Sequence, residues 1–387
     1  IQDSQQENSL VATPYIESGA TTGKAGILEN TPRLDYSGGA TCPSLLLEPS
    51  RTNLLVQSEY FEASYWIKSG GSLTSGFVSP DGTSNAYKFV EDTSTGTHIL
   101  NKNIGAADGN SYTSSVFAKK GERGYLTLYS GGVFTDSCTF NLENGTSINN
   151  GTSTSKIELI SNGWYKCSVT SINKSRDVYA MVNNGSSGTS GVVYTGDGTS
   201  GVYIYGAQLE QGSYPTSYIP TYGSAVTRSV DAMYKTGASA LINSSQGTIF
   251  IETKFNSGST TYTERIVKID DGGSGSNQIG FSRYSTDSLN FYLVSGGVTQ
   301  SNIIIALKGE SYTNMKLAVS YAHNRIKVFR DGVEIGSDLS ADMAVGLSRI
   351  LFGNDTSGNL LSDQDMKQLL FFPTALTDSE CIALTTI

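Results

Sequence analysis

The chain has 387 residues, of which 37% are hydrophobic and only 16% charged, and Asp plus Glu exceed Lys plus Arg by 35 to 26. The net charge of -9 provides no broad positive field for a phosphate backbone, which argues against nucleic acid as a partner. No stretch approaches the roughly 20 apolar residues that a helix needs to cross a bilayer, so membrane insertion is not expected.

The N-terminal part, from Ser9 to Leu55, contains apolar residues but too few regular strands for a core of its own. We therefore expect residues 1–52 to form an extended segment. The run Leu45-Leu46-Leu47 must be buried somewhere, and a neighbouring subunit is one candidate for its partner.

Residues 53–220 are rich in short apolar runs that alternate with Gly, Ser, Asn and Asp, as expected for strands with one buried face. The turn dipeptides Asn144-Gly145, Asn162-Gly163 and Asn184-Gly185 suit antiparallel strands joined by tight turns. The pattern predicts a first β-sandwich with strands at 86–90, 114–118, 125–129, 138–142, 164–169, 178–182 and 202–207.

The four cysteines contain no C-x-x-C pair, so sulfur ligation of a metal is not expected. Cys138 and Cys167 could form a disulfide between neighbouring strands, or both could be buried thiols in a core. The remaining cysteines are Cys42 and Cys381.

Residues 221–235 are interpreted as a linker to a second domain. The stretch 212–224 that leads into it contains two prolines and three tyrosines, and these tyrosines predict that it packs against a surface.

A second strand series over 236–387 predicts another sandwich, with strands at 247–255, 265–269, 278–283, 289–294, 316–321 and 366–372. Asp331-Gly332 between alternating runs predicts a type I′ hairpin. Thr377-Asp378-Ser379-Glu380 predicts a capping box that opens a short terminal helix. The fold class is thus all-β, with two antiparallel β-sandwich (jelly-roll) domains in tandem behind an extended N-terminal segment.

Two family resemblances accompany these patterns. The second series resembles a laminin-G or concanavalin-A-like sandwich through 247–251, 324–333 and 371–380. The first half resembles modular proteins of phage tails. The segments that carry this resemblance are 32–36, 44–55, Ser58-Glu59-Tyr60-Phe61 with Trp66, Pro80-Asp81-Gly82-Thr83, 162–167, Tyr205-Gly206-Ala207-Gln208-Leu209-Glu210 and Tyr218-Ile219-Pro220-Thr221.

The phage resemblance implies a jelly-roll of carbohydrate-binding-module type inside a virion fibre or receptor-binding protein, commonly a homotrimer on an extracellular particle. It leads us to expect adhesion to a host-surface polysaccharide or glycoconjugate, with other virion proteins as partners. A structural head-fibre, decoration or assembly protein stays open as the alternative, and a capsule depolymerase as a third.

Catalysis has weak support in the sequence, and we expect no enzyme. Glycan hydrolysis needs two carboxylates a few ångström apart, and there is no E-x-D-x-x-E run. The nearest acidic cluster, Asp363-Gln364-Asp365, reads as a solvated turn. The two histidines, His98 and His323, occur in no recognisable catalytic motif.

No cofactor is expected with certainty, although relatives of both resembled families hold structural calcium with loop oxygens. The candidate ligands are the loop carboxylates Asp270, Asp271, Asp355 and Asp363. Turn capping is the competing interpretation of these residues.

Sugar recognition is plausible through aromatic faces that stack on pyranose rings. Tyr125 and Tyr129, four residues apart on one expected strand, are predicted to point to the same face. Arg123, two residues before Tyr125, is expected on that face too, and Tyr179 on a neighbouring strand. Each tyrosine could equally be buried. Trp66 and Trp164 are assigned to the core.

Overall fold

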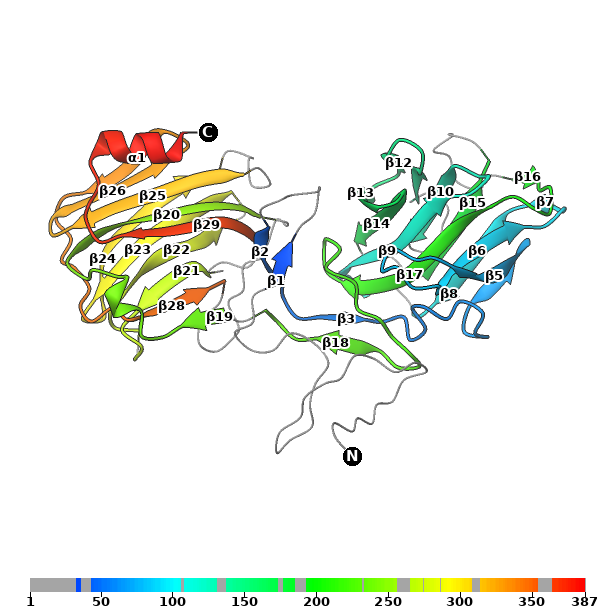
Figure 1. The fold of residues 1–387 in the computed structure, drawn as a ribbon, viewed down its shortest axis with the longest axis horizontal. Coiled ribbons are helices and arrows are strands. Elements are labelled where there is room, and N and C mark those ends of the chain that lie inside the picture. Colours follow the sequence, from blue (N-terminus) through cyan, green and yellow to red (C-terminus); the bar gives the residue numbers. More distant parts are fainter. Residues whose placement is uncertain are drawn as a thin grey trace, which may run out of the picture. The chain divides into compact units, whose positions relative to one another are not determined.

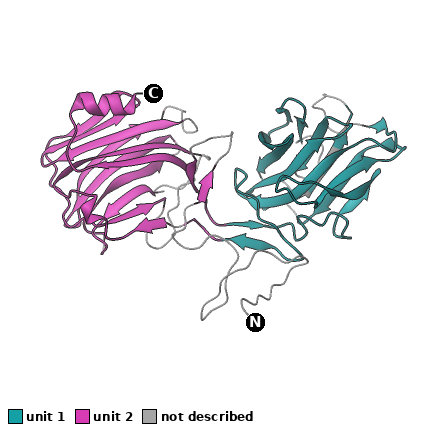
Figure 2. Cartoon of the chain, viewed as in Figure 1, with its two compact units in different colours: residues 1–25, 51–228 teal, residues 26–50, 229–387 magenta. Residues whose placement is uncertain are grey.

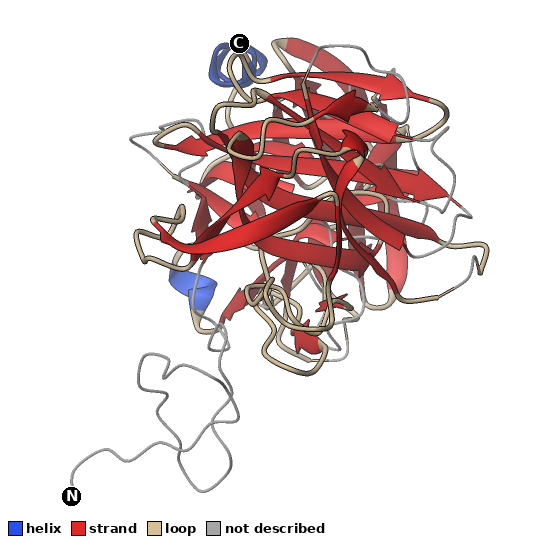
Figure 3. Ribbon diagram, turned by 90° about the vertical axis from the view of Figure 1, so that its right-hand side faces the viewer, coloured by secondary structure: helices blue, strands red, loops and turns tan. Residues whose placement is uncertain are grey.

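The computed structural model describes residues 33–35, 43–105, 108–130, 137–172, 177–184, 193–231, 233–255, 265–273, 275–285, 287–307, 314–353 and 364–386. These residues are mostly antiparallel strands, and their helices are the short 3-10 helix η2 (Ala238–Ala240) and α1 (Asp378–Thr385) (Figure 3). The all-β prediction is confirmed. The chain divides into unit 1, which includes Arg51–Arg228, and unit 2, which includes Gly26–Ser50 and Ser229–Ile387 (Figure 2).

Unit 1 is built from two six-stranded antiparallel sheets (Figure 1). In spatial order the first contains β12 (Thr146–Asn150), β11 (Ser137–Asn141), β10 (Tyr125–Ser130), β15 (Asp177–Asn183), β8 (His98–Asn103) and β4 (Ile67–Ser69). The second contains β13 (Thr154–Ser161), β14 (Trp164–Ile172), β9 (Ser111–Lys120), β17 (Gly201–Gln211), β6 (Ala86–Glu91) and β5 (Gly71–Phe77). Two short ribbons join β7 (Thr95–Gly96) to β16 (Tyr194–Thr195) and β3 (Arg51–Asn53) to β18 (Val226–Arg228).

The core of unit 1 follows from alternation along the strands. Val202 and Ile204 of β17 and Leu126 and Leu128 of β10 belong to one buried cluster, and none is more than 1% exposed. Residues between them point to the opposite face of their sheet. The strand predicted at each of the seven positions between 86 and 207 is present.

Unit 2 pairs a seven-stranded with a six-stranded antiparallel sheet. The larger contains β1 (Arg33–Asp35), β2 (Ser44–Leu47), β29 (Gln364–Phe372), β20 (Gln246–Phe255), β25 (Met315–Ala322), β26 (Arg325–Arg330) and β27 (Val333–Asp338). The smaller contains β19 (Met233–Lys235), β28 (Arg349–Phe352), β21 (Arg265–Asp270), β22 (Gln278–Ser285), β23 (Ser288–Ser295) and β24 (Val298–Ala306).

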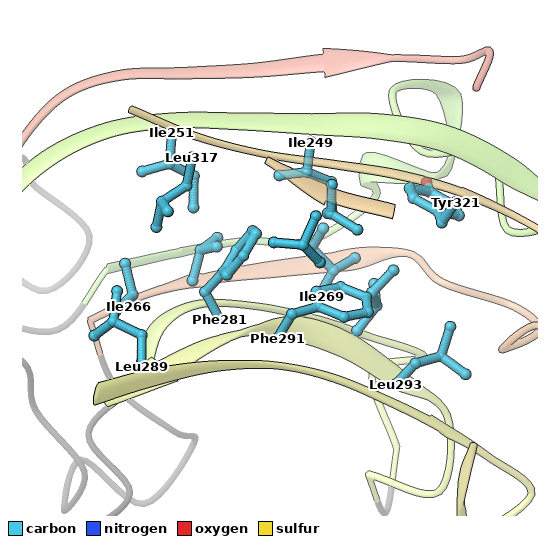
Figure 4. Packing of buried hydrophobic residues seen from close by; sticks show 14 of the residues in the cluster. Ile249, Ile251, Ile266, Ile269, Phe281, Leu289, Phe291, Leu293, Leu317 and Tyr321 are labelled. Atoms are coloured by element: carbon cyan, nitrogen blue, oxygen red, sulfur yellow. The ribbon is translucent and has the colours of Figure 1, made fainter. Parts of the chain in front are cut away.

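The core of unit 2 fills the space between these sheets. Ile249, Ile251 and Leu317 point from the larger sheet toward Phe281 and Phe291 of the smaller one (Figure 4). All five are fully buried. This layer of branched and aromatic side chains is the main apolar contact of unit 2, worth about 2 kcal/mol for each side chain removed from water.

The leucine run near the N-terminus belongs to this second sandwich. Strand β2 pairs with β29, with Leu45 opposite Met366 and Leu47 opposite Gln364, and Leu47 is 1% exposed. The described part of this run is therefore covered within its own chain. The N-terminal segment is therefore not a separate part of the chain throughout. Its residues 26–50 belong to unit 2, together with the second sandwich.

Two local sequence signals in unit 2 predict a hairpin turn and the start of the terminal helix. Asp331 and Gly332 have φ values of 48° and 82° between β26 and β27, as a type I′ hairpin requires. The side chain of Thr377 accepts a hydrogen bond from the Glu380 backbone N–H, and Glu380 bonds back to the Thr377 backbone. Both predictions are confirmed.

The described cysteines are buried free thiols. Cys138 on β11 and Cys167 on β14 lie in the core of unit 1, and Cys381 is a residue of α1 that packs with Phe250 and Phe329 in unit 2. The expectation of a disulfide between neighbouring strands is wrong, because β11 and β14 belong to different sheets and both thiols are free. Cys42 lies outside the described residues.

Candidate functional site

The outward face of the sheet that contains β17 carries an aromatic layer separate from the core of unit 1. Because Val202 and Ile204 point into the core, Tyr203 and Tyr205 point outward. Tyr205 lies opposite Phe117 of β9. Together these residues belong to a cluster, here called the outer aromatic cluster, that contains Phe77, Phe117, Trp164, Tyr203, Tyr205 and Tyr218.

The rings of this cluster form two contact groups. Phe77 and Tyr203 meet edge to face with centroids 4.9 Å apart. Phe117, Tyr205 and Tyr218 are mutually 5.7 to 5.8 Å apart. Tyr205 is only 5% exposed, whereas four of the others are partly exposed. The buried members thus support a surface of exposed ring edges and faces.

A glycine allows these rings to come together. The register of β17 against β9 shifts between Tyr205 and Gln208, and Gly206 within this bulge has φ +59°. A Cβ at Gly206 would lie 3.0 Å from Phe117 and 3.1 Å from the Tyr218 ring. Glycine is therefore required both by the backbone and by the rings above it.

Two carboxylates lie at the edge of the cluster. The Tyr205 hydroxyl is 3.0 Å from Glu59 Oε1 and 2.9 Å from Asp81 Oδ2, and its single proton serves one of them at a time. Tyr222 donates to Glu59 Oε2 over 2.7 Å. Neither carboxylate forms an ion pair with a described residue, so both offer acceptor oxygens rather than a neutralised pair.

The pKa values of Asp81 and Tyr205 favour a phenol that donates to an ionised carboxylate. Burial opposes the charge of Asp81, but hydrogen bonds from Ser79, Thr83 and Tyr205 outweigh it and lower the pKa of Asp81 to about 2. Burial and the neighbouring charges of Glu59 and Asp81 raise the pKa of Tyr205 far above its usual value. At neutral pH the phenol is a donor and Asp81 a carboxylate.

The stretch 212–222 crosses the rest of this face and is held by buried polar groups. Glu210 accepts hydrogen bonds from the Thr216 backbone N–H at 2.8 Å and from the Thr216 hydroxyl at 2.6 Å. The Ile219 N–H donates to Gln208 over 2.7 Å. The prediction that this tyrosine-rich stretch packs against a surface is confirmed.

The residues predicted for sugar binding lie on the other sheet of unit 1 or near it. Tyr125 and Tyr129 share the outward face of β10, and Tyr179 lies directly opposite Tyr129 on β15. The placement of Tyr179 on a neighbouring strand is confirmed, although its side chain lies outside the description. Tyr129 is 1% exposed and contacts Ile99, while the Tyr125 hydroxyl accepts a hydrogen bond from Asn141 over 3.2 Å.

Arg123 does not join these tyrosines. It precedes the first residue of β10, so strand alternation does not fix its direction. Its guanidinium forms a two-pronged ion pair with Glu91, with Nε 2.9 Å from Oε2. Tyr194 donates to the same Glu91 over 2.6 Å. This buried arrangement occupies Arg123 within the protein.

The predicted calcium ligands are occupied or outside the description. Arg349 binds both oxygens of buried Asp270 at 2.8 Å, and Lys268 lies 3.1 Å away. Burial opposes ionisation of Asp270, but the hydrogen bonds from Arg349, Gly272 and Lys268 outweigh it and lower its pKa. These cations stand where calcium would bind, so Asp270 does not fit as a ligand.

The second candidate ligand, Asp271, accepts hydrogen bonds from the Gly273 N–H at 2.9 Å and from Asn277 at 3.1 Å. This is the turn-capping arrangement that competed with calcium in the sequence interpretation. Asp355 and Asp363 lie outside the described residues. In the part of the chain that the structure describes, no three His, Cys, Asp or Glu residues are grouped to hold a metal ion.

The two tryptophans are both buried, but they belong to different clusters. Trp66 is 3% exposed and belongs to the core of unit 1. Trp164 is 2% exposed but packs in the outer aromatic cluster, on the other face of its sheet. The core assignment is therefore confirmed for Trp66, whereas Trp164 is buried outside that core.

The sequence analysis did not select the outer aromatic cluster as a site, although its segments were visible. Glu59, Asp81, Tyr205 and Tyr218 come from four of the short segments that carry the phage-tail resemblance. The structure brings these four segments together beside Tyr205 of β17. The available signal was the alternation of Tyr203 and Tyr205 with two core residues, followed by glycine.

Comparisons with known proteins concern the fold. No protein-family model matches the chain, and no curated protein matches it in sequence. The carbohydrate-binding module CBM40 of the Ruminococcus gnavus IT-sialidase, solved with alpha2,3 sialyllactose, is 18% identical over 38% of this chain and 84% of that one, with a TM-score of 0.33. Sheep galectin-11 is 10% identical over 37% and 95%, with a TM-score of 0.24.

The mouse laminin alpha1 domains LG4-5 are 13% identical over 80% of this chain and 94% of that one, with a TM-score of 0.26. The neighbours are thus lectin-type β-sandwich domains. The likeness concerns this architecture and carries nothing about ligands. In the described residues no helix is long and apolar enough to span a membrane.

Proposed function

We propose that this chain is a non-enzymatic adhesin of a virion fibre that binds host-surface glycans through the outer aromatic cluster of unit 1. The observation that carries the proposal is the pairing of partly exposed aromatic rings with two carboxylates that have no cationic partner among the described residues. Aromatic faces bind the apolar side of a sugar ring, and carboxylates accept hydrogen bonds from its hydroxyls.

The cluster is well suited to weak, repeated contacts. Tyr203 and Phe77 are held edge to face, so little side-chain entropy is lost when a ligand covers them. Gly206 lies directly against the rings of Phe117 and Tyr218, and the buried Tyr205 packs beside them. Several copies on one fibre would raise the effective concentration for later contacts, which makes modest single-site affinity sufficient.

The lowered pKa of Asp81 suits a hydrogen-bond acceptor better than a general acid. Glu59 Oε1 and Asp81 Oδ2 lie 3.0 and 2.9 Å from the same phenol oxygen of Tyr205, so the two carboxylates are close together. A glycosidase needs one such group as a general acid with a raised pKa. The pKa of Asp81 is instead lowered to about 2, which suits an acceptor and supports the non-enzymatic proposal.

The place of the chain on a virion rests on the resemblance of its segments to phage-tail proteins, and a homotrimer is proposed on the same basis. Light scattering coupled to size-exclusion chromatography tests the trimer. A monomer at micromolar concentration contradicts it. Labelling of intact particles with an antibody against the chain tests whether it lies on a fibre or on the head.

A glycan array probed with the full chain tests the binding function. We expect Tyr203→Ala to weaken retention by about tenfold or more, because it removes an exposed ring of the cluster. The matched control is Tyr284→Ala, a tyrosine that is 49% exposed in unit 2. Equal retention of both variants, or no retention of the folded native chain on any glycan or host envelope, contradicts the proposal and leaves a structural virion role.

A further inference from the structure

Lys119 lies in the middle of the outer aromatic cluster. On β9 it is directly opposite Tyr203 of β17 on one side and Trp164 of β14 on the other. Opposed residues of an antiparallel pair present their side chains on the same face, with Cβ atoms about 5 Å apart. The ammonium group of Lys119 thus extends from the same surface as the Tyr203 ring.

Lys119 differs from the other described cations of unit 1 in having no hydrogen bond, ion pair or ring contact within the described chain. Each of the others has such a contact. Lys88 pairs with Glu122, Lys120 with Glu143, Lys156 with Glu158 and Arg123 with Glu91, Lys102 lies over Tyr65, Arg51 over Tyr214, and Lys68, Lys166 and Arg228 donate to backbone carbonyls.

Two lysines flank Tyr203, and only one of them is paired with a carboxylate of the described chain. Lys88, the lysine opposite Tyr203 on β6, is 2.6 Å from Glu122 and is neutralised by it. Lys119, on the other side of the same ring, has no carboxylate partner among the described residues. A sugar ring stacked on Tyr203 would bring one of its substituents to an unpaired ammonium group, which prefers an anion.

We infer that the outer aromatic cluster selects saccharides that carry a carboxylate, such as hexuronic acids, with Lys119 as the residue that determines this specificity. The inference rests on the proposed function and names its ligand class. The sugar ring covers Tyr203, its carboxylate accepts a hydrogen bond from Lys119, and its hydroxyls reach the acceptors Glu59 and Asp81. Because Lys119 is the one cation without a partner among the described residues of unit 1, the cluster takes one carboxylate for each bound sugar.

The experiment uses the full chain on an array of uronic-acid oligosaccharides, each printed beside its carboxyl-reduced counterpart and beside neutral oligosaccharides. The native chain should bind the acidic form about five- to tenfold more tightly than the reduced form, which is the range for a partly hydrated charged hydrogen bond. Lys119→Gln should bind both forms equally, and Lys119→Arg should restore the preference.

The control is Lys120→Gln, which makes the same charge change one residue away at a lysine already paired with Glu143 over 2.7 Å. It should keep the preference for the acidic form. If Lys119→Gln and Lys120→Gln lose equal amounts, the effect is general electrostatics and the inference is overturned.

The failure of this inference differs from the failure of the proposed function. If the native chain binds neutral or carboxyl-reduced glycans as well as acidic ones, and Tyr203→Ala still abolishes that binding, the glycan function stands and Lys119 has no selective role. If no glycan of any class is retained by the folded chain, both are overturned.

Discussion

Substitution of Gly206 by alanine tests the packing on which the outer aromatic cluster depends. The residue has φ +59°, a conformation that costs an L-residue about 1 to 2 kcal/mol. The new Cβ would also lie 3.0 Å from Phe117 and 3.1 Å from Tyr218, so both rings must move. Overpacking of this kind costs about 1 to 3 kcal/mol, and the sum predicts a loss of about 2 to 5 kcal/mol in the free energy of unfolding.

The matched control for this substitution is Gly109→Ala. Gly109 also lies in unit 1 with φ +85°, and a Cβ there meets nothing within 4 Å. It should therefore show the backbone cost alone, about 1 to 2 kcal/mol. The difference between the two variants isolates the contact with the rings.

Urea denaturation followed by tryptophan fluorescence measures both variants. The two tryptophans of the chain, Trp66 and Trp164, are both in unit 1, so the signal reports this unit specifically. If Gly206→Ala is no more destabilising than Gly109→Ala, the rings do not pack over Gly206 and the description of the cluster is refuted.

Three further predictions concern charged groups of unit 1. Glu210→Ala removes the buried acceptor of Thr216 and should destabilise the unit by about 2 to 3 kcal/mol and speed proteolysis of 212–222, as measured by limited digestion. Asp81, whose pKa falls from 3.8 to about 2 on folding, stabilises the unit above about pH 4, and this contribution is lost as the pH falls toward 2. Asp81→Asn should therefore flatten the acid limb of the stability curve, and an unchanged limb contradicts it. Arg123→Met leaves Glu91 buried without its cation and should lower the free energy of unfolding by about 3 kcal/mol in urea titrations. The double variant that adds Glu91→Gln should recover part of this loss, and a loss below about 1 kcal/mol contradicts the buried pair.

Much of the fold could be predicted from local signals in the sequence. The two-residue period places Val202 and Ile204 on one face and Tyr203 and Tyr205 on the other, and this period needs no distant partner. The positive φ values at Asp331 and Gly332 likewise follow from the dipeptide itself. Strands, hairpin and terminal helix were therefore readable in advance.

The candidate site depends on contacts between distant segments. Tyr205 is more than a hundred residues from Glu59 and Asp81 in the sequence, and Arg123, just before β10, pairs with Glu91 of β6, 32 residues away. Alternation shows which side chains point away from the core. It does not show which loop, neighbouring segment or charged group they contact there. The sequence analysis placed Arg123 on the face of Tyr125, whereas the structure pairs Arg123 with Glu91.

The sequence by itself determined the all-β character, the strand positions and the two faces of each strand, because these depend on short-range geometry and on the burial of every second residue. Only the tertiary structure decided that Leu47 pairs with β29 of its own chain, that Phe117 and Tyr218 meet over Gly206, and that Lys119 lies opposite Tyr203. Strand register across a sheet is a long-range property, set by the packing of the whole sandwich and encoded in no single segment.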